Sequence, residues 1–145
     1  MQPYTGTELS SSLVAAHVRI LGNTVTVSGA DDLSFPDNSH DYVVVFSVVH
    51  YFPDETYLKR ALAEATRVAR KAVLICDIRT QPREAVQDRY QFKEKTALEH
   101  LLVPKESVKA LIPYHMPFEI SPAYHDHHGG SYNLLIRISQ VRKEL

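Results

Sequence analysis

Polar residues that could act on a ligand follow three short segments that we expect to be strands. They are Glu8 after residues 4–7, Asp31 and Asp32 after residues 25–27, and Ser47 and His50 after residues 41–46. Carboxylates can accept hydrogen bonds from hydroxyl groups, and histidine can act as a base near neutral pH. In open α/β sheets ligands bind beyond the carboxyl ends of the strands. If these segments are neighbouring strands, the five side chains therefore converge on one crevice.

The elements that must position these residues alternate between the helical and the strand period. We expect helices over residues 10–22, 54–68, 87–100 and 104–111, and strands over residues 4–7, 25–27, 41–46 and 71–78. The run 41–46 is almost continuously apolar, as strands buried on both faces of a parallel sheet are. Residues 118–124 and 132–138 alternate more, with a turn at 126–130, which indicates a β-hairpin.

This order of elements predicts an α/β fold with three layers, a mostly parallel sheet and an antiparallel edge formed by the C-terminal hairpin. At 145 residues we expect a single domain, 1–145. Apolar residues make up 44% and charged residues 23%, as in soluble globular proteins. The net charge of −1 gives no basic field, which disfavours nucleic acid as the main partner.

The single cysteine and the N-terminus point to an ordinary cellular environment. Cys76 lies in an apolar run, where we expect it to pack as a small hydrophobe rather than act as a nucleophile. The first residues do not form a signal peptide, and no apolar run approaches the ~20 residues of a membrane span. We therefore expect a cytoplasmic protein without membrane attachment.

Five segments in the first half of the chain carry a family resemblance. They are Gly6–Ser10, Ala30–Asp37, Asp41–Ser47, Val49–His50 and the Glu-x-x-Arg-Val of Glu64–Val68. In this order and spacing they resemble the class I S-adenosylmethionine-dependent methyltransferases that act on small molecules. The resemblance covers roughly residues 4–78, and the remainder only in its general layout of helices and a hairpin. It implies a Rossmann-like methyltransferase fold and S-adenosyl-L-methionine as the cofactor.

The resemblance also implies roles for individual residues. Glu8 would accept hydrogen bonds from both ribose hydroxyls, while the backbone amide of Ala30 and the side chain of Asp31 would meet the adenine edge. Ser47 and His50 would lie near the methyl-bearing sulfonium or the acceptor, with His50 as the candidate catalytic base. Because the cofactor already carries an activated methyl group, catalysis consists largely of positioning.

Each of these residues also has a purely structural interpretation. Glu8 could be a solvated residue ahead of a helix, and Asp31 and Asp32 could be turn formers. His50 could be a packed histidine at the end of a buried strand. Gly29 stands where the family often has a polar or acidic residue, so the adenine contact depends on Asp31 and on backbone.

The family's glycine-rich signature is absent from this sequence. Such enzymes begin with a strand and a Gly-x-Gly-x-Gly turn, and the 5 glycines of this chain form no such turn. The family's first strand lies in the middle of the sheet, so its loss predicts two open strand edges. The chain could be a fragment, its remaining strands could close the gap, or another chain could supply the strand. We expect a homo-oligomer or a partner chain that covers the open edge.

A histidine cluster near the C-terminus invites a metal interpretation. His125, His127 and His128 surround Asp126, with His115 further upstream. Imidazole suits zinc, but adjacent histidines beside Gly-Gly are typical of an exposed hairpin turn. We therefore predict no metal site.

Two functions of different classes follow from the sequence. The first is an S-adenosylmethionine-dependent methyltransferase-like protein with a small-molecule acceptor, whose activity the missing glycine-rich loop puts in question. The second is a non-catalytic pseudo-methyltransferase that serves as a binding or scaffolding subunit. A generic nucleotide-binding α/β domain is a third interpretation.

Overall fold

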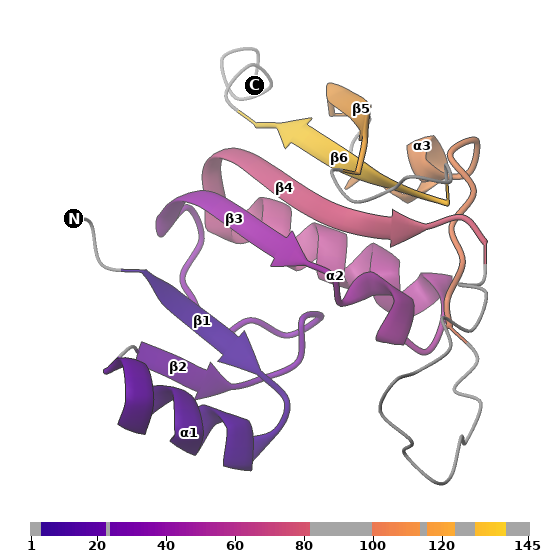
Figure 1. The fold of residues 1–145 in the computed structure, drawn as a ribbon. Coiled ribbons are helices and arrows are strands. Elements are labelled where there is room, and N and C mark those ends of the chain that lie inside the picture. Colours follow the sequence, from indigo (N-terminus) through magenta and orange to yellow (C-terminus); the bar gives the residue numbers. More distant parts are fainter. Residues whose placement is uncertain (1–3, 23, 82–99, 114–115, 124–129, 139–145) are drawn as a thin grey trace, which may run out of the picture.

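The computed structural model describes residues 4–22, 24–81, 100–113, 116–123 and 130–138. Its elements, in chain order, are β1 (Thr5–Glu8), α1 (Ser11–Leu21), β2 (Thr24–Val27), β3 (His40–Phe46), the 3₁₀ turn η1 (Val49–Tyr51), α2 (Glu55–Val68), β4 (Ala69–Arg79), α3 (Val108–Leu111), β5 (Phe118–Pro122) and β6 (Ser131–Arg137). Figure 1 shows the strands in two groups, with β1 and β2 apart from the other four. The predicted alternation of helices and strands is confirmed.

The first group is a β–α–β unit in which β1 pairs in parallel with β2. The connecting helix α1 begins because the Ser10 side chain accepts a hydrogen bond from the Leu13 amide at 3.4 Å. It ends at Gly22, whose φ of 65° is the left-handed conformation that closes a helix, and whose amide donates to the Val18 carbonyl at 3.1 Å. Both predicted helix ends are therefore confirmed.

The second group is a four-stranded mixed sheet in the order β3-β4-β6-β5. β3 and β4 run in parallel, whereas β6 is antiparallel to both β4 and β5. The predicted C-terminal hairpin is thus confirmed, and it forms the antiparallel edge. The turn predicted inside it, at 126–130, lies mostly outside the described residues.

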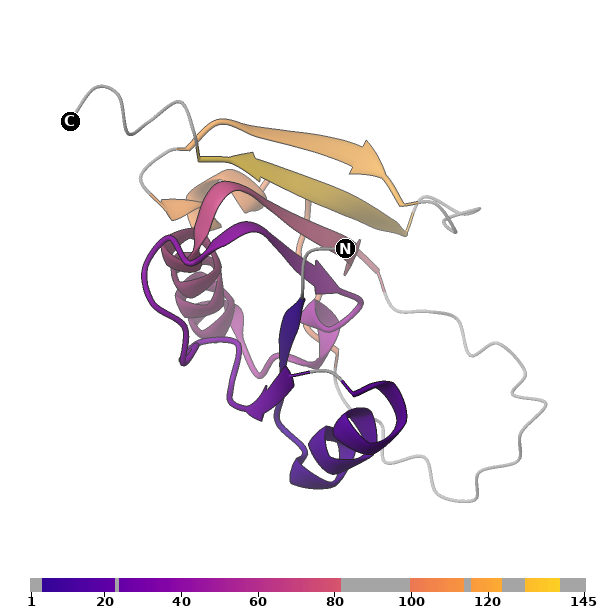
Figure 2. The same ribbon diagram turned by 90° about the vertical axis from the view of Figure 1, so that its left-hand side faces the viewer.

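Helix α2 connects the two parallel strands of this sheet. Asp54 caps it by accepting a hydrogen bond from the Tyr57 amide at 2.7 Å, and Glu55 in its first turn suits the helix dipole. Its apolar stripe, which includes Leu58, Leu62 and Ala65, is buried against the sheet. Figure 2 shows α1 and α2 on opposite sides of the strands, in agreement with a layered α/β fold.

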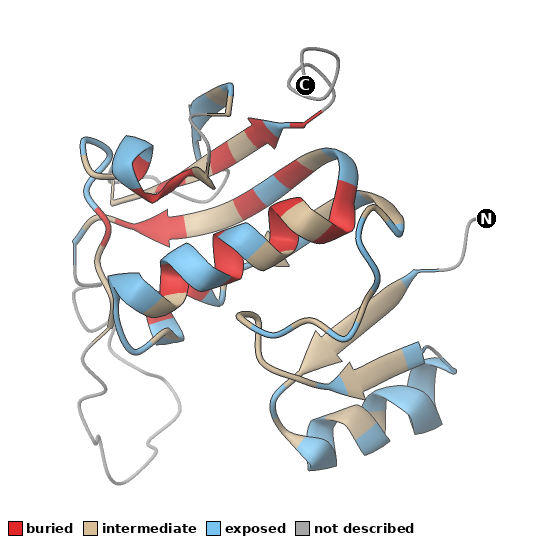
Figure 3. Ribbon diagram, turned by 180° about the vertical axis from the view of Figure 1, so that it is seen from behind, coloured by how far each residue is buried: buried red, intermediate tan, exposed pale blue. Residues whose placement is uncertain are grey.

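Burial is concentrated in the second group. The core consists mainly of residues from α2, β4, β6 and the segment 103–112, including Val73, Ile75, Val103, Tyr132 and Leu134. In Figure 3 the buried residues lie on these elements, whereas the β1–α1–β2 unit is intermediate or exposed. Helix α1 contains no buried residue. The N-terminal unit therefore contributes little to the buried core.

The expectation that residues 41–46 are buried on both faces is wrong. Val43 and Val45 are partly buried against the core, but Tyr42, Val44 and Phe46 remain 64%, 62% and 68% exposed. Alternate residues of a strand point to opposite faces, so one face of β3 packs on α2 and the other is bare. No helix among the described residues covers that second face.

Two helix predictions have different outcomes. The helix expected over 104–111 is confined to α3, Val108–Leu111, because residues 105–107 form a turn ahead of it. The helix expected over 87–100 falls almost entirely outside the described residues.

Candidate functional site

A cavity of about 660 Å³ separates β1 from β3. Its walls are the two strands, the turn after β2, and α2. The lining residues include Thr5, Gly6, Thr7, Glu8, Ala30, Val43, Val44, Val45, Tyr51, Tyr57, Leu58 and Leu62. Within the described residues no strand joins β1 to β3, so the strands form two sheets. This division agrees with the predicted loss of a central strand.

One side-chain hydrogen bond joins the two strands at their amino ends. The Thr5 hydroxyl lies 2.8 Å from His40 Nε2, and the other ring nitrogen, Nδ1, lies 2.9 Å from the Ser39 hydroxyl. The His40 ring also meets Phe35 edge-on, with centroids 4.8 Å apart. A contact between side chains rather than backbone pairing therefore joins β1 to β3 at this end.

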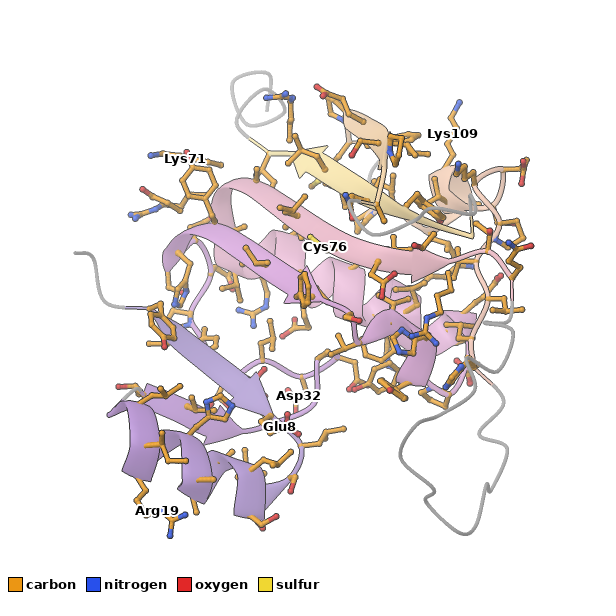
Figure 4. The ribbon with its side chains drawn as sticks, in the orientation of Figure 1. Glu8, Arg19, Asp32, Lys71, Cys76 and Lys109 are labelled. Atoms are coloured by element: carbon orange, nitrogen blue, oxygen red, sulfur yellow. The ribbon has the colours of Figure 1, made fainter. Side chains whose placement is uncertain are left out.

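Glu8 lies at the carboxyl end of β1 and lines the cavity. Its carboxylate accepts a hydrogen bond from the Ser10 amide at 3.0 Å, which fixes the side chain at the start of α1. Its carbonyl accepts a hydrogen bond from the Ser28 amide at 3.2 Å, and the Ser28 hydroxyl donates to the Asp32 carbonyl at 3.1 Å. The turn after β2 is thus adjacent to Glu8, and Figure 4 shows Glu8 and Asp32 at the same edge.

Ala30 and Asp31, the residues predicted to contact the adenine edge, both form hydrogen bonds with side chains of α2. The Ala30 amide donates to the Tyr57 hydroxyl at 3.1 Å. One carboxylate oxygen of Asp31 accepts from Arg60 Nε at 3.0 Å and Nη2 at 2.9 Å. Partial burial opposes ionisation of Asp31, but the hydrogen bonds from Arg60 and Tyr57 outweigh it and lower the pKa of that carboxyl. Asp31 is therefore a charged group that already has a cationic partner.

Gly29 has a steric reason to be glycine. A Cβ atom at this position would lie 2.8 Å from Asp31 Oδ1 and 3.2 Å from the Tyr57 hydroxyl oxygen. Those two groups occupy the space beside Gly29, where the resembled family often has a polar or acidic side chain. Glycine at position 29, which departs from the family pattern, thus leaves room for the contact between this turn and Tyr57 of α2.

Ser47 follows β3 and is held by a residue that sequence reasoning missed. Its hydroxyl donates to Asp77 Oδ2 at 2.8 Å, and the Asp77 amide donates to the Asn133 side chain at 3.2 Å. Ser47 and Asp77 have positive φ values, 54° and 60°, which cost energy outside glycine. Strain of this kind is concentrated at functional sites. The signal for Asp77 was its place in β4, the strand that pairs with β3, which Ser47 follows.

His50 is buried, with 1% of its surface exposed, and is not among the described residues that line the cavity. Its ring lies 4.1 Å from Tyr51 and 5.1 Å from His100, measured between centroids. His100 Nδ1 in turn lies 3.1 Å from Arg79 Nη1. The neighbouring Tyr51 does line the cavity. His50 thus lies behind the wall that Tyr51 forms.

Arg67 joins α2 to the loop between β2 and β3. Its guanidinium donates to Glu64, to Asp37 and to the carbonyls of Leu33 and Phe35, at 2.7 to 3.0 Å. The hydrogen bond to Glu64, followed by that to Asp37, raises the pKa of Arg67 further. Glu64 and Arg67 of the Glu-x-x-Arg motif therefore position the loop between β2 and β3, which includes the turn that lines the cavity.

The described residues offer little support for a reactive thiol or a metal site. Cys76 is partly exposed, and burial, followed by the nearby Asp77 charge, raises the pKa of its thiol, which disfavours a reactive thiolate. In the described part of the chain no three His, Cys, Asp or Glu side chains gather as a metal site would require. The histidines at 115, 125, 127 and 128 lie outside that part. None of the helices described has the length and hydrophobicity to span a membrane.

The fold and the cavity together define a class of protein. Parallel β–α–β units, an antiparallel terminal hairpin and polar residues at the carboxyl ends of the strands are the features of a Rossmann-like ligand-binding domain. The family model described as "Methyltransferase domain" matches residues 2–77, just over half of the 145 residues. The chain belongs to this methyltransferase family, which confirms the resemblance, and S-adenosyl-L-methionine is the cofactor that this resemblance implies.

Solved structures share the fold at low sequence identity. A possible exported protein from Bordetella parapertussis matches with a TM-score of 0.68 at 12% identity, over 93% of this chain and 53% of its own. A possible histamine N-methyltransferase from Thermotoga maritima matches with a TM-score of 0.62 at 19% identity, over 94% and 72%. Magnesium protoporphyrin IX methyltransferase from Synechocystis, solved with S-adenosylmethionine bound, matches with a TM-score of 0.58 at 12% identity, over 93% and 59%. No curated protein sequence matches the chain.

Proposed function

We propose that residues 1–145 form a single, truncated methyltransferase-like domain that binds the nucleoside part of S-adenosyl-L-methionine and acts on a small-molecule acceptor. One observation carries the proposal: Glu8 and Ala30 line the same cavity at adjacent strand ends. A carboxylate is the acceptor that ribose hydroxyls require, and a backbone amide is the donor that a purine edge requires. The Glu8 carboxylate and the Ala30 amide therefore fit a nucleoside.

In this proposal Glu8 accepts hydrogen bonds from the ribose hydroxyls, and the Ala30 amide donates to the adenine edge with Asp31 beside it. The Ala30 amide is already satisfied by Tyr57, and Asp31 by Arg60. Binding thus requires the base to take over the hydrogen bond that Tyr57 now accepts. This exchange weakens the affinity for the nucleoside.

Ser47 and His50 are proposed on the side of the methyl group and the acceptor. When bound, the cofactor would supply a methyl carbon activated by its sulfonium, so these residues need only orient the acceptor and accept its proton. Asp77 fixes the direction of the Ser47 hydroxyl. Because His50 is 1% exposed and its ring lies against Tyr51 and His100, an acceptor could reach it only if neighbouring side chains move.

The proposal includes a second polypeptide, either another copy or a different partner, that covers the open sheet edge. Among the described residues no strand lies between β1 and β3, where the resemblance would place the family's glycine-rich first strand. A non-catalytic binding subunit is the second candidate. It is favoured by the engagement of Ala30 and Asp31 with α2, which leaves the nucleoside to compete for them.

Thermal unfolding with S-adenosylhomocysteine tests the proposed function. We expect millimolar ligand to raise the melting temperature, because a ligand that binds only the folded state stabilises it. Adenosine should give a similar shift, since the proposed contacts are to the nucleoside, and methionine should give none. An unchanged melting temperature with both S-adenosylhomocysteine and adenosine would remove the proposal.

A further inference from the structure

Arg79, the last residue of β4, is a buried cation without a described counter-ion. Only 8% of its surface is exposed. Its Nη1 lies 3.1 Å from His100 Nδ1, and its Nε has no hydrogen-bond partner. None of the ion pairs among the described residues includes Arg79. A guanidinium removed from water normally has an anionic partner, because its desolvation is costly. The guanidinium of Arg79 therefore points to a bound anion.

Backbone hydrogen bonds place Arg79 and His100 at the carboxyl ends of β3 and β4. The Leu101 amide donates to the carbonyl of His50, which follows β3, at 3.0 Å. The Val103 amide donates to the Arg79 carbonyl at 2.8 Å. The chain from Leu101 to Val103 thus bridges η1 and β4. As a result His100 contacts both the His50 ring, at 5.1 Å between centroids, and the Arg79 guanidinium.

This pair of side chains presents hydrogen-bond donors next to the candidate site. Arginine has donors only, so it is His100 Nδ1 that accepts from Arg79. The proton of a neutral His100 ring then lies on Nε2, which is a second donor. The His100 ring meets Tyr51 edge-on at 5.5 Å, and Tyr51 lines the cavity. Donors that adjoin the cavity in this way suit a negatively charged group.

We propose that Arg79 and His100 bind a carboxylate of the methyl acceptor. Arg79 Nε and Nη2 share one edge of the planar guanidinium, and no hydrogen bond among the described residues uses that edge. Two parallel donors match the two oxygens of a carboxylate. Nε is shielded from solvent, so the carboxylate reaches it only when a neighbouring side chain moves. The inference rests on the proposed function and names the class of its acceptor, a small organic acid.

The test uses benzoate as the probe and contains no cofactor. Benzamide, which has the same shape without the charge, is the control ligand, and the ionic strength is held constant with sodium chloride. Millimolar benzoate should raise the melting temperature of the full chain saturably, and benzamide should not. In ¹⁵N NMR the Nε–H resonance of Arg79 should shift with the same dependence on benzoate concentration.

Three variants locate the anion. Arg79→Met removes a buried cation without a described counter-ion, so it should not lower the melting temperature of the ligand-free chain. It should weaken benzoate binding at least about tenfold. Arg79→Lys keeps the charge but lacks the edge with two donors, and should weaken binding at least about threefold. Arg70→Met, an exposed arginine of the same strand paired with Asp41, should leave binding unchanged.

Four outcomes would overturn the inference. Equal effects of benzoate and benzamide would show apolar adsorption, and unchanged benzoate binding in Arg79→Met would place the anion elsewhere. Melting temperatures of both Arg79 variants well below that of the unaltered chain would show that the guanidinium serves the fold. Tighter binding of phenyl phosphate than of benzoate would assign the site to a phosphate. Benzoate binding without any binding of S-adenosylhomocysteine would contradict the proposed function alone.

Discussion

The Ala30 amide donates a hydrogen bond of 3.1 Å to the phenol oxygen of Tyr57, so helix α2 holds the turn at which the adenine edge is proposed to bind. Tyr57 also packs on Phe52, with ring centroids 4.7 Å apart, and beneath the Arg60 guanidinium at 5.5 Å. Burial, followed by the hydrogen bond with Asp31, raises the pKa of Tyr57 and keeps the phenol protonated. A ligand at Ala30 must therefore displace an existing partner.

Replacement of Tyr57 by phenylalanine removes that partner and keeps the ring. We expect Tyr57→Phe to lower the free energy of unfolding by about 1 kcal/mol, because the Ala30 amide loses its acceptor. For the same reason the affinity for S-adenosylhomocysteine should rise about threefold to tenfold. Urea unfolding and calorimetry measure the two effects. Tyr42→Phe, on the opposite wall of the cavity, is the control, and equal affinities for the two variants would contradict the competition.

Arg67 should contribute more to stability than the surface cations near it. Removal of its guanidinium in Arg67→Ala leaves the Leu33 and Phe35 carbonyls and Glu64 without these donors. We expect a loss of about 1–3 kcal/mol in chemical unfolding. Arg70→Ala breaks one exposed ion pair with Asp41 and should cost less than about 1 kcal/mol. Similar losses for both variants would show that the Arg67 contacts do not hold the loop.

Tyr132 gives the fold a defined sensitivity to alkaline pH. Its hydroxyl donates to the Val103 carbonyl at 3.1 Å, and burial raises its pKa to about 12. The unfolded chain releases this proton near pH 10 while the folded chain retains it. The stability associated with it is thus complete below pH 10 and is lost between pH 10 and about 12.

We expect the free energy of unfolding to fall by roughly 2–3 kcal/mol over this interval because of Tyr132. Lys71, whose pKa is raised by Asp41, acts in the same direction, so the comparison must be with Tyr132→Phe. Urea titrations at successive pH values should show that the free energy of unfolding of this variant falls less steeply as the pH rises. If the free energy of unfolding fell equally with pH in the unaltered chain and in Tyr132→Phe, burial would not raise the pKa of Tyr132.

The sequence was most informative where local rules determine the structure. The caps at Ser10, Gly22 and Asp54, the parallel strands and the C-terminal hairpin all follow from residue type and spacing. The bare face of β3 was missed because an apolar strand looks the same whether or not its second face is covered. Covering depends on elements far away in sequence, which the pattern of the strand does not encode.

The candidate site was predictable as a set of strand ends but not as a set of contacts. Glu8 and Ala30 do line one cavity, while His50 lies behind Tyr51. The engagement of Asp31 by Arg60 joins residues 29 positions apart, and the hydrogen bond between Ser47 and Asp77 joins residues 30 apart. Such pairings depend on how α2 and β4 pack, so residue types alone could not give them.

Calorimetric titration of the full chain with S-adenosylhomocysteine, repeated for Glu8→Gln, tests the central claim most directly. Glu8→Gln keeps the size of the side chain and an acceptor for the Ser10 amide, but removes the charge proposed to hold the ribose. Glu55→Gln, at the start of α2, is the control. The account predicts weak, saturable binding that Glu8→Gln reduces at least about tenfold and Glu55→Gln does not. Binding of equal strength in Glu8→Gln, or no heat from the unaltered chain at millimolar ligand, would contradict it.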